Sequence, residues 1–452
     1  MHDLVSQKWI AAGRGFAILM SVRQNLHILA VALLAMVTAS AEVRYLSSDG
    51  DDSADGRSPE RAWRTLGRLN SSLPPGGEAR LRRGDVFFGG LDVKGGIDAQ
   101  HPTVVTAFGS GPRPEISRYK IAKPVESAWE NVTGAVWRID LRDPSRFSGD
   151  TASPDANVGF LRVNGTIHGT KRRSTAELST WLEFCHDGGY AYVWSGFCPA
   201  ALSPDFRFAC NGRGLALKSH TVVSNLVVRG CGGHGAQFAG ENIRIENCAF
   251  REIGGSYLIW GGDPHTRYGN GVECWAGTRH VLVTKCDFSD IYDVAFTIQG
   301  NSPPFSWEDI HMTDSTISRC TQGFEVWAAA CKPGVGFVDC SFERNAVIGC
   351  GWSWGNGGRP GVPLLVYVMD TDTCNILVKG NVFRGTRAET LHKSGGLCKL
   401  PGGYDVRDNL IELKDGATIG NVGEFDRREA GLAREAEIRA RNRIVKEGEN
   451  HE

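Results

Sequence analysis

The sequence lacks a surplus of charge of either sign. Lys and Arg number 50 against 51 Asp and Glu, a formal net charge of −1, and the basic residues are dispersed along the chain. Proteins that bind nucleic acids usually carry a basic stripe, so no nucleic-acid partner is expected. Hydrophobic residues make up 41% of the chain, which is too many for a wholly disordered protein.

The apolar run near the N-terminus is short. It extends from Ile28 to Val37, follows a basic region around Arg23 and ends in small residues up to Ala41. A transmembrane helix needs about 20 apolar residues, whereas a signal peptide needs only such a short run. We expect cleavage after Ala41 and a secreted or periplasmic protein with no membrane span, an uncleaved anchor being the alternative. Met20 is a second candidate start, which would make residues 1–19 an upstream extension.

Metal-binding spacings are also missing. The 13 Cys form no paired Cys-x-x-Cys pattern, which favours small buried side chains over zinc ligands. The acidic loop Asp49–Asp52 lacks EF-hand spacing, so we expect no cofactor, with Ca²⁺ at this loop the one open possibility. Disulfides are permitted in an exported protein, and Cys185 and Cys198, which bracket a short Gly-rich hairpin, are the best local pair.

A repeat begins near Asn225. Three stretches align without a gap, each after an alternating strand, and two further stretches fit the same frame. Their first residues are Cys248, Cys286, Ser315, Cys340 and Asn381. The spacing indicates a coil of about 25 residues, with extra residues looped out of some coils.

The repeat predicts columns of equivalent residues in stacked coils. Parallel coils place the same position about 4.8 Å apart, so neighbours in a column must suit one another. One inward column is predicted from Cys231, Cys248, Cys286, Ser315, Cys340 and Asn381. An apolar column two residues later is predicted from Phe250, Phe288, Ile317, Phe342 and Phe383. Stacked coils of this kind form an all-β parallel solenoid.

Both ends of such a solenoid need a cover. A short helix around Trp63–Leu69 has Trp63, Leu66 and Leu69 on one face and can cover the first coil. The strand, the Asp/Gly loop, this helix and the Gly84-Asp85 turn resemble the opening of many exported right-handed β-helix proteins. The expected fold is therefore a right-handed parallel β-helix with an N-terminal helical cap.

The chain outside the repeat predicts the remaining parts. Short strands at 135–139, 160–163 and 191–194 indicate a small antiparallel β insertion, and the charged tail indicates a cap or a solvated helix. The expected divisions are residues 1–41 (extension and signal peptide), 42–124 (cap and first coils), 125–216 (insertion), 217–424 (main coils) and 425–452 (tail).

Two Glu-x-Trp pairs stand on one outer face of the predicted solenoid. Alternation points Val272 and Cys274 inward, so Glu273 and Trp275 point outward, and in the same way Glu325 and Trp327 point outward. An exposed Trp is costly unless something stacks on it, and sugar rings offer apolar faces for stacking.

A third acid lies on the coil between these pairs. Strict alignment would point Phe296 and Ile298 outward, so a one-residue bulge is favoured that points Asp293, Thr297 and Gln299 outward instead. Glycoside hydrolysis needs two carboxyl groups, and Glu273, Asp293 and Glu325 would supply three on consecutive coils. The alternative is that these acids are solvated or structural.

Other side chains are placed to wall a groove. His265, Arg267 and Tyr268 lie in a loop inserted before Glu273 and are candidate substrate-binding residues, as are Trp275, Gln299 and Trp327. Further candidates for the lining and the next coil are Trp260, Trp352, Trp354, His392 and Lys393.

The segments Arg267–Trp275, Tyr292-Asp293 and Gly323–Trp327 resemble uncharacterised carbohydrate-active β-helix proteins, a resemblance that covers roughly residues 44–420. It implies the β-helix fold and a carbohydrate-active protein. The three outward acids then favour an exported, monomeric glycoside hydrolase that acts on a polysaccharide, with Glu273, Asp293 and Glu325 as catalytic residues. Related helices host several reactions. A polysaccharide lyase acting on a uronate glycan and a non-catalytic glycan-binding protein therefore stay open.

Overall fold

The computed structural model describes residues 41–448 except for 154, 260–262, 329–330, 358–360, 369–373, 387–389, 395–403 and 421–427. Residues 1–40, which hold the expected signal peptide except for Ala41, lie outside the described residues, and so does Trp260. In the part of the chain that is described, no helix is both long and apolar enough to span a membrane.

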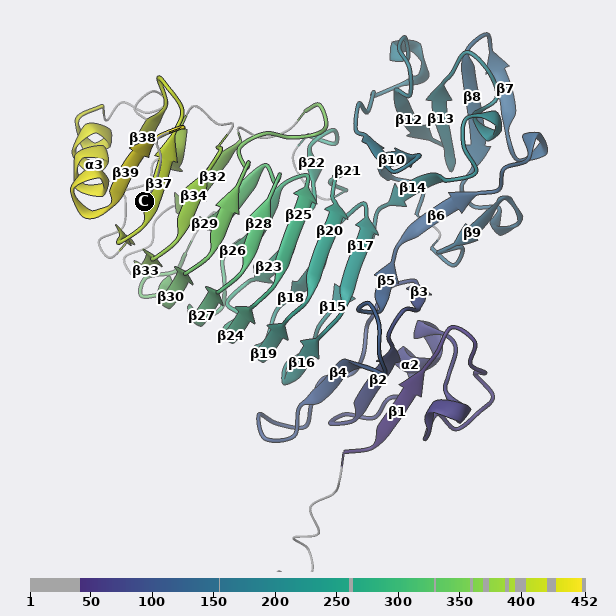
Figure 1. The fold of residues 1–452 in the computed structure, drawn as a ribbon, viewed down its shortest axis with the longest axis horizontal. Helices are drawn as coiled ribbons and strands as arrows, with labels where there is room; N and C mark the ends of the chain where they lie inside the picture. The colour runs from purple at the N-terminus through teal and green to yellow at the C-terminus, as the bar shows by residue number, and fades with distance from the viewer. Residues whose placement is uncertain are drawn as a thin grey trace, which may run out of the picture. The chain divides into compact units, whose positions relative to one another are not determined.

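Most of the chain winds through three parallel sheets, called sheets 1, 2 and 3 here, which the coils between Thr221 and Gly420 visit in that order (Figure 1). Sheet 1 contains β1 (Val43–Leu46), β2 (Glu78–Arg82), β4 (Thr103–Phe108), β16 (Thr221–Ser224), β19 (Glu241–Glu246), β24 (Arg279–Thr284), β27 (Trp307–Thr313), β30 (Phe337–Glu343), β33 (Cys374–Lys379) and β36 (Tyr404–Arg407). Sheet 2 contains β3 (Val86–Phe88), β5 (Glu115–Ser117), β17 (Val227–Cys231), β20 (Ala249–Ile253), β25 (Asp287–Ile291), β28 (Thr316–Ser318), β31 (Ala346–Ile348), β34 (Val382–Arg384), β37 (Leu410–Leu413) and β39 (Arg443–Lys446).

Sheet 3 contains β15 (Leu215–Ala216), β18 (Ala236–Phe238), β23 (Val272–Trp275), β26 (Val294–Gly300), β29 (Gln322–Ala328), β32 (Val362–Val368), β35 (Thr390–Ser394) and β38 (Thr418–Gly420). Neighbouring strands in all three sheets pair in parallel, for example β24 with β27 and β26 with β29. This arrangement confirms the predicted all-β parallel β-helix.

The core lies inside the coils and is built from columns of like side chains. Phe250 stacks on Phe288 with ring centroids 5.0 Å apart and an angle of 12° between the rings. Trp307 stacks on Phe337 at 4.6 Å and 6°. Equivalent positions in parallel coils lie about 4.8 Å apart, so flat rings in one column fall into stacking contact.

A ladder of amides crosses five coils on the inner side of the turn before sheet 2. The main-chain N–H of Ser315 donates to Oδ1 of Asn345, and the next rungs repeat this contact from Asn345 to Asn381, Asn381 to Asn409 and Asn409 to Asn442, at 2.8–3.0 Å. The side-chain amides of Asn345 and Asn381 also donate to the carbonyls of Met312 and Phe342. We call Asn345, Asn381, Asn409 and Asn442 the Asn ladder.

The predicted columns were partly wrong. Cys248, Cys286, Ser315 and Asn381 do share a column, but Asn345 stands where Cys340 was expected. Cys340 pairs with Ile310 and Phe342 with Met312 in sheet 1, and Cys231 pairs with Ile253 in sheet 2, away from the ladder. Val347 takes the place expected for Phe342 in the apolar column.

The N-terminal cover is confirmed, although its helix begins later than expected. Helix α2 spans Leu66–Ser72, and the hydroxyl of Thr65 accepts a hydrogen bond from the N–H of Arg68 at its start. Leu66, Leu69 and the preceding Trp63 are all buried in the core of the coils. In the acidic loop, Asp52 accepts hydrogen bonds from Arg64 and Thr65, so this carboxylate serves the turn before the helix.

Antiparallel strands interrupt the early coils, as predicted for this part of the chain. One sheet orders β11 (Thr166–His168), β10 (Val158–Val163), β14 (Phe206–Cys210), β6 (Tyr119–Ala122) and β9 (Phe147–Gly149). The other orders β12 (Phe184–Asp187), β13 (Tyr190–Trp194), β8 (Val136–Asp140) and β7 (Glu130–Thr133). These strands begin and end before the boundaries expected at 125 and 216, and they enclose a separate apolar core around Phe184 and Phe208.

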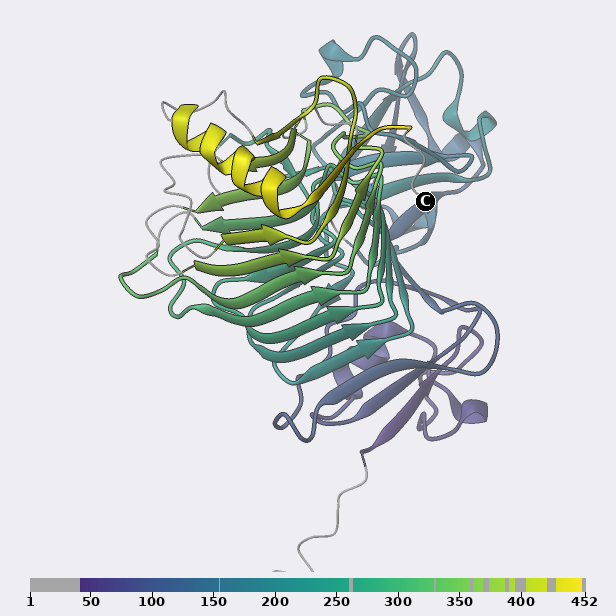
Figure 2. The same ribbon diagram turned by 60° about the vertical axis from the view of Figure 1, so that its left-hand side comes forward.

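Short helices and one hairpin complete the description. The 3₁₀ helices are η1 (Pro59–Arg61), η2 (Glu126–Ala128), η3 (Pro144–Arg146), η4 (Thr175–Glu177) and η5 (Pro199–Ala201), and β21 (Ser256–Tyr257) pairs with β22 (Arg267–Tyr268) in a two-stranded hairpin. Helix α3 (Arg428–Arg441) lies at the far end of the coils (Figure 2). Ile438 of this helix is buried in the core, so the tail contributes a cap rather than a solvated helix.

The suggested pairing of Cys185 with Cys198 was wrong. Both thiols are free, and they pack into different apolar clusters of the antiparallel layer. Burial raises the pKa of the Cys185 thiol to about 12, which keeps it protonated and unreactive at neutral pH.

Replacing a rung of the Asn ladder should destabilise the protein. Asn381→Ala removes the side-chain partner of the buried N–H of Asn345 and of the Phe342 carbonyl, at a cost of about 2–4 kcal/mol. Urea denaturation followed by circular dichroism measures this loss. Asn131→Ala is the matched control, because the exposed Asn131 side chain donates to the nearby Gly134 carbonyl. Equal stability of the two variants would contradict a role for the ladder.

Candidate functional site

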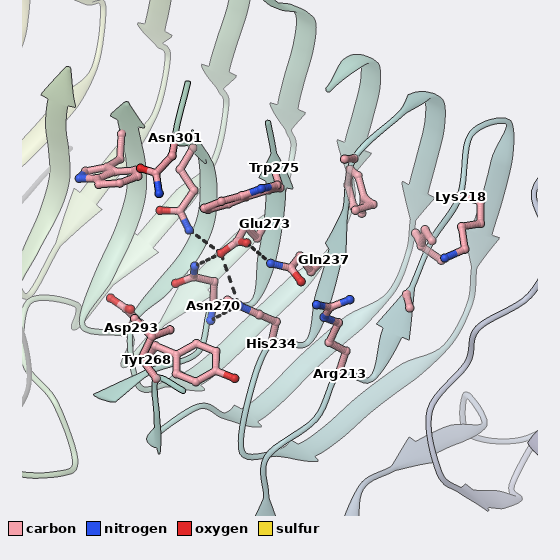
Figure 3. Close-up of a pocket in the computed structure, with 17 residues that line it drawn as sticks. Arg213, Lys218, His234, Gln237, Tyr268, Asn270, Glu273, Trp275, Asp293 and Asn301 are labelled. Atoms are coloured by element: carbon pink, nitrogen blue, oxygen red, sulfur yellow. Dashed lines mark hydrogen bonds and ion pairs between the residues drawn. The ribbon is translucent and has the colours of Figure 1, made fainter. Parts of the chain in front are cut away.

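A pocket of about 740 Å³ opens on the outer side of sheet 3 (Figure 3). Strands β18, β23, β26 and β29 supply its floor, and segments before and after the strands of sheet 3 supply its walls. Its lining consists of Arg213, Ala216, Leu217, Lys218, His234, Gln237, Phe238, Ala239, Leu258, Tyr268, Asn270, Glu273, Trp275, Asp293, Gln299, Asn301 and Trp327.

Glu273 is the centre of the polar network in this pocket. It points outward from β23, as predicted, yet only 1% of it is exposed. The amides of Gln237 and Gln299 donate to its two oxygens, and Asn270 donates to Oε2 at 2.7 Å. Three donors, one from each of three successive coils, hold the carboxylate in one orientation, and Figure 3 shows those of Gln237 and Asn270.

His234 lies beside this carboxylate, with Nδ1 3.5 Å from Oε2 of Glu273. The same Nδ1 accepts the main-chain N–H of Asn270 at 3.1 Å, which leaves the proton of the neutral ring on Nε2. Burial lowers the pKa of His234, the charge of Arg213 lowers it further, and Glu273 opposes both. The imidazole is therefore neutral at neutral pH, and its contact with Glu273 is not an ion pair.

Tyr268 lines the pocket as predicted. Its hydroxyl donates to Oδ1 of Asn211 at 2.5 Å, and its ring meets that of His234 edge-on with centroids 5.0 Å apart. Burial and the charge of Asp155 raise the pKa of Tyr268 to about 12. The phenol thus stays protonated at neutral pH and offers a hydroxyl to the pocket rather than a charge.

The structure brings Asp293 into the same pocket as Glu273, but not into the same column. Asp293 lies in the turn before β26, four residues ahead of Thr297, which is the neighbour of Glu273 in register. It is 4% exposed. Asp293 therefore lies on the coil between the two Glu residues, as predicted, but ahead of the strand that carries Thr297 and Gln299.

Glu325 does share the column of Glu273, with Thr297 between them. Its Oε2 accepts a hydrogen bond from the Thr297 hydroxyl at 3.2 Å, and it is 1% exposed. Two coils separate the two acids, or about 9.6 Å. Glu325 is absent from the pocket lining, so the pocket brings together only two of the three predicted acids.

The second outward column consists of Trp275, Gln299 and Trp327, all half-buried and all in the lining. Phe296 and Ile298 point into the core, as the burial of large apolar residues required. No bulge is needed for this, since β26 pairs with β23 in unbroken register. The predicted bulge was wrong. The extra residues of longer coils lie in the turns between sheets, so the strands themselves stay in register.

Arg267 does not face the pocket, contrary to prediction. It is 3% exposed, and its guanidinium donates at 2.7–2.9 Å to the carbonyls of Gly159, Gly169, Gly255 and Asn356. It also lies over the Tyr292 ring. Two of these carbonyls, those of Gly159 and Gly169, belong to the antiparallel layer, so the hydrogen bonds of Arg267 hold that layer against the coils.

Other predicted lining residues lie elsewhere. His265 borders a separate pocket of about 410 Å³ next to Tyr257 and His186. Trp354 packs against Phe160 and Tyr292, and neither it nor Trp352 is in the main lining. Strand β35 holds His392 and Lys393, whose side chains lie outside the described residues.

Several lining residues were not predicted at all. Arg213 and Lys218 bring positive charge to one end of the pocket, and Lys218 also faces Asp92 at 3.5 Å. His234, Gln237 and Asn270 surround Glu273. Gln237 could have been found by extending the column of Glu273 back by one coil, since the two residues are register neighbours.

Comparison with known proteins supports the fold. Residues 208–383 match the family model described as "Right handed beta helix region", in agreement with the predicted hand. No curated protein matches the sequence.

Solved structures resemble the chain only distantly. XylC in complex with xylose has 10% identity and a TM-score of 0.43, over 82% of this chain and 69% of that one. The GH136 lacto-N-biosidase from Eubacterium ramulus has 12% identity and a TM-score of 0.37, over 98% and 75%. A rhamnogalacturonan lyase has 10% identity and a TM-score of 0.39, over 91% and 89%. None of these likenesses is strong enough to indicate an activity for this chain.

Removing the Arg267 guanidinium should destabilise the fold rather than act on the pocket directly. Arg267→Met removes the guanidinium donor from three buried carbonyls and from the part-buried Asn356 carbonyl, which should cost roughly 3 kcal/mol or more. Thermal and urea unfolding measure this cost. Arg173→Met is the control, because Arg173 is exposed. A stable Arg267→Met variant would show that the guanidinium is dispensable for holding the antiparallel layer.

Proposed function

We propose that the pocket on sheet 3 binds and hydrolyses a glycan, with Asp293 and Glu273 as the pair of carboxyl groups. Glycoside hydrolysis needs one carboxyl group to protonate the leaving oxygen and a second one to attack or to activate water. Both residues line the same pocket, whose size suits a few sugar units.

The observation that carries this proposal is the fixed carboxylate of Glu273. Its three amide donors come from different coils, so its position does not depend on a single flexible side chain. A preorganised carboxylate facing a pocket suits a nucleophile or a base better than a solvated surface acid does. Asp293, the second carboxyl group in the lining, is assigned the proton-donating role.

The walls of the pocket fit a sugar. Trp275 and Trp327 stand in one column with Gln299 between them, so the pocket presents two indole rings flanking a polar amide. Sugar rings bind in this way, with their apolar faces on aromatic rings and their hydroxyls on amides. We propose a secreted or periplasmic monomer whose partner is a polysaccharide or oligosaccharide.

A lyase acting on a uronate glycan is the second candidate, and the cationic end of the pocket favours it. Arg213 and Lys218 could bind a uronate carboxylate, while the neutral His234 or Tyr268 could move the proton. The candidates differ in their products, because a lyase leaves an unsaturated end that absorbs ultraviolet light. A panel of neutral and uronate polysaccharides, read for reducing ends and for absorbance, separates them.

On a substrate found in that panel, Asp293→Asn should lower turnover by about 10²–10⁴-fold and leave glycan binding intact. Glu273→Gln should lower turnover similarly. The control is Asp314→Asn, since Asp314 lies away from the pocket in an exposed ion pair with Arg344.

Near-normal turnover in both pocket variants would refute the assignment, and unsaturated products would favour the lyase. Glu325→Gln tests whether Glu325, rather than Asp293, is the partner of Glu273 in the catalytic pair. A loss as large as that of Asp293→Asn would assign the pair to Glu273 and Glu325, whose separation of about 9.6 Å lies near the range of inverting enzymes. Glycan binding without any turnover in the unmodified protein would leave a binding protein instead.

Trp327→Ala should affect glycan binding more than turnover, the reverse of what is expected for Asp293→Asn. The half-buried indole contributes stacking, so its loss should weaken glycan binding by about tenfold with a smaller effect on turnover. Trp181→Ala is a matched control, because Trp181 is 47% exposed and is not among the lining residues of the pocket. A loss confined to turnover would show that Trp327 does not contact the glycan.

A further inference from the structure

A cluster of His and Asp side chains lies on the outer side of sheet 1, away from the strands that form the pocket. His280, Asp309 and Asp339 occupy the same place in three consecutive coils, on β24, β27 and β30. All three have positive φ, at 52°, 53° and 49°. His311 follows Asp309 by two residues on β27, and its register neighbour on the next coil is Ser341.

The side chains converge on Asp309. Nδ1 of His280 lies 2.9 Å from one of its oxygens, and Nε2 of His311 lies 2.8 Å from the other. Nδ1 of His311 is 2.8 Å from the Ser341 hydroxyl. One ligand atom from each of Asp309, His311 and Asp339 falls within 4.8 Å of the others, a spacing that a single metal ion can bridge.

Asp309 and Asp339 differ from other outward-facing acids in the charge of the residue opposite them on the next coil. Asp290 and Asp314 each face an Arg on the next coil, in the ion pairs Asp290–Arg319 at 2.6 Å and Asp314–Arg344 at 2.8 Å. Asp309 instead faces Asp339. Within the described residues, neither of these two acids forms an ion pair with Lys or Arg, so two negative charges adjoin without a fixed cation. A bound cation would offset this repulsion.

We propose that Asp309, His311 and Asp339 bind a divalent transition-metal ion of the Zn²⁺ class. One imidazole and two carboxylates are ligands that Zn²⁺ accepts, whereas Ca²⁺ takes six to eight oxygens and avoids nitrogen. With Nε2 on the metal, Nδ1–H of His311 donates to Ser341, and His280 holds Asp309 from outside the coordination sphere. The ion joins two adjacent coils where other columns use Asp–Arg pairs, so its role is to stabilise the stack.

Titration of the chelator-treated full chain with ZnCl₂, followed by calorimetry, tests this site. The expected result is saturable binding of a single ion with micromolar or tighter affinity, and a higher melting temperature with Zn²⁺. Asp339→Asn and His311→Ala should abolish this binding, and His280→Ala should weaken it by about 10–100-fold. Asn tolerates positive φ, and Asp339 is exposed, so Asp339→Asn retains the fold even if His311→Ala does not.

His101→Ala is the matched control. His101 forms an exposed pair with Asp98 at 2.9 Å, but no third ligand completes a site there within the described residues, so Zn²⁺ binding should be unchanged. Absence of saturable Zn²⁺ binding in the unmodified chain would overturn the proposal. So would unchanged binding in folded Asp339→Asn, which would place the ion elsewhere, or Ca²⁺ binding as tight as that of Zn²⁺, which would refute the ligand class.

Discussion

The parallel register between coils is the constraint on which the rest of this structure depends. Each side chain has an equivalent about 4.8 Å away in the coil before and after it, so chemistry is arranged in columns rather than in isolated residues. In the core the rule produces stacked rings such as Phe250 on Phe288 and the Asn ladder. On the outer side it places Gln237 beside Glu273, and on sheet 1 it places Asp309 beside Asp339.

The sequence predicted the coils well but could not always assign a strand to its sheet. The pattern of a small residue followed two positions later by Phe occurs at Cys248, Cys286 and Cys340 alike. The first two precede strands of sheet 2, whereas Cys340 lies within β30 of sheet 1. Both strands point these residues inward, so local alternation is the same for either sheet. Only the pairing with the previous coil, which is not local, identifies Asn345 as the true member of the ladder.

The pocket was predictable where its residues lie within strands. Glu273, Trp275 and Trp327 follow from alternation alone, and each lies where it was expected. Gln299 also points outward as expected, but without the bulge that was predicted to place it there. Residues in turns were predicted less well, because a turn can aim a side chain at the pocket or at another part of the chain. Arg267 was expected beside the substrate, but the carbonyls that it binds come from residues about a hundred positions earlier and later, and sequence spacing holds no trace of them.

The hairpin strand β22 links the antiparallel layer to the pocket through two adjacent residues. Arg267 points to the carbonyls of Gly159 and Gly169, while Tyr268 points to the pocket and donates to Asn211 at the end of β14. Asn157 of the same layer bonds both main-chain groups of Tyr257, the partner of Arg267 in the hairpin. The wall that carries Tyr268 is therefore held by the antiparallel layer and not by the coils alone. A change that loosens this layer should reach the pocket through Tyr268 first, because the floor residues Glu273 and Gln299 are fixed by the register of sheet 3.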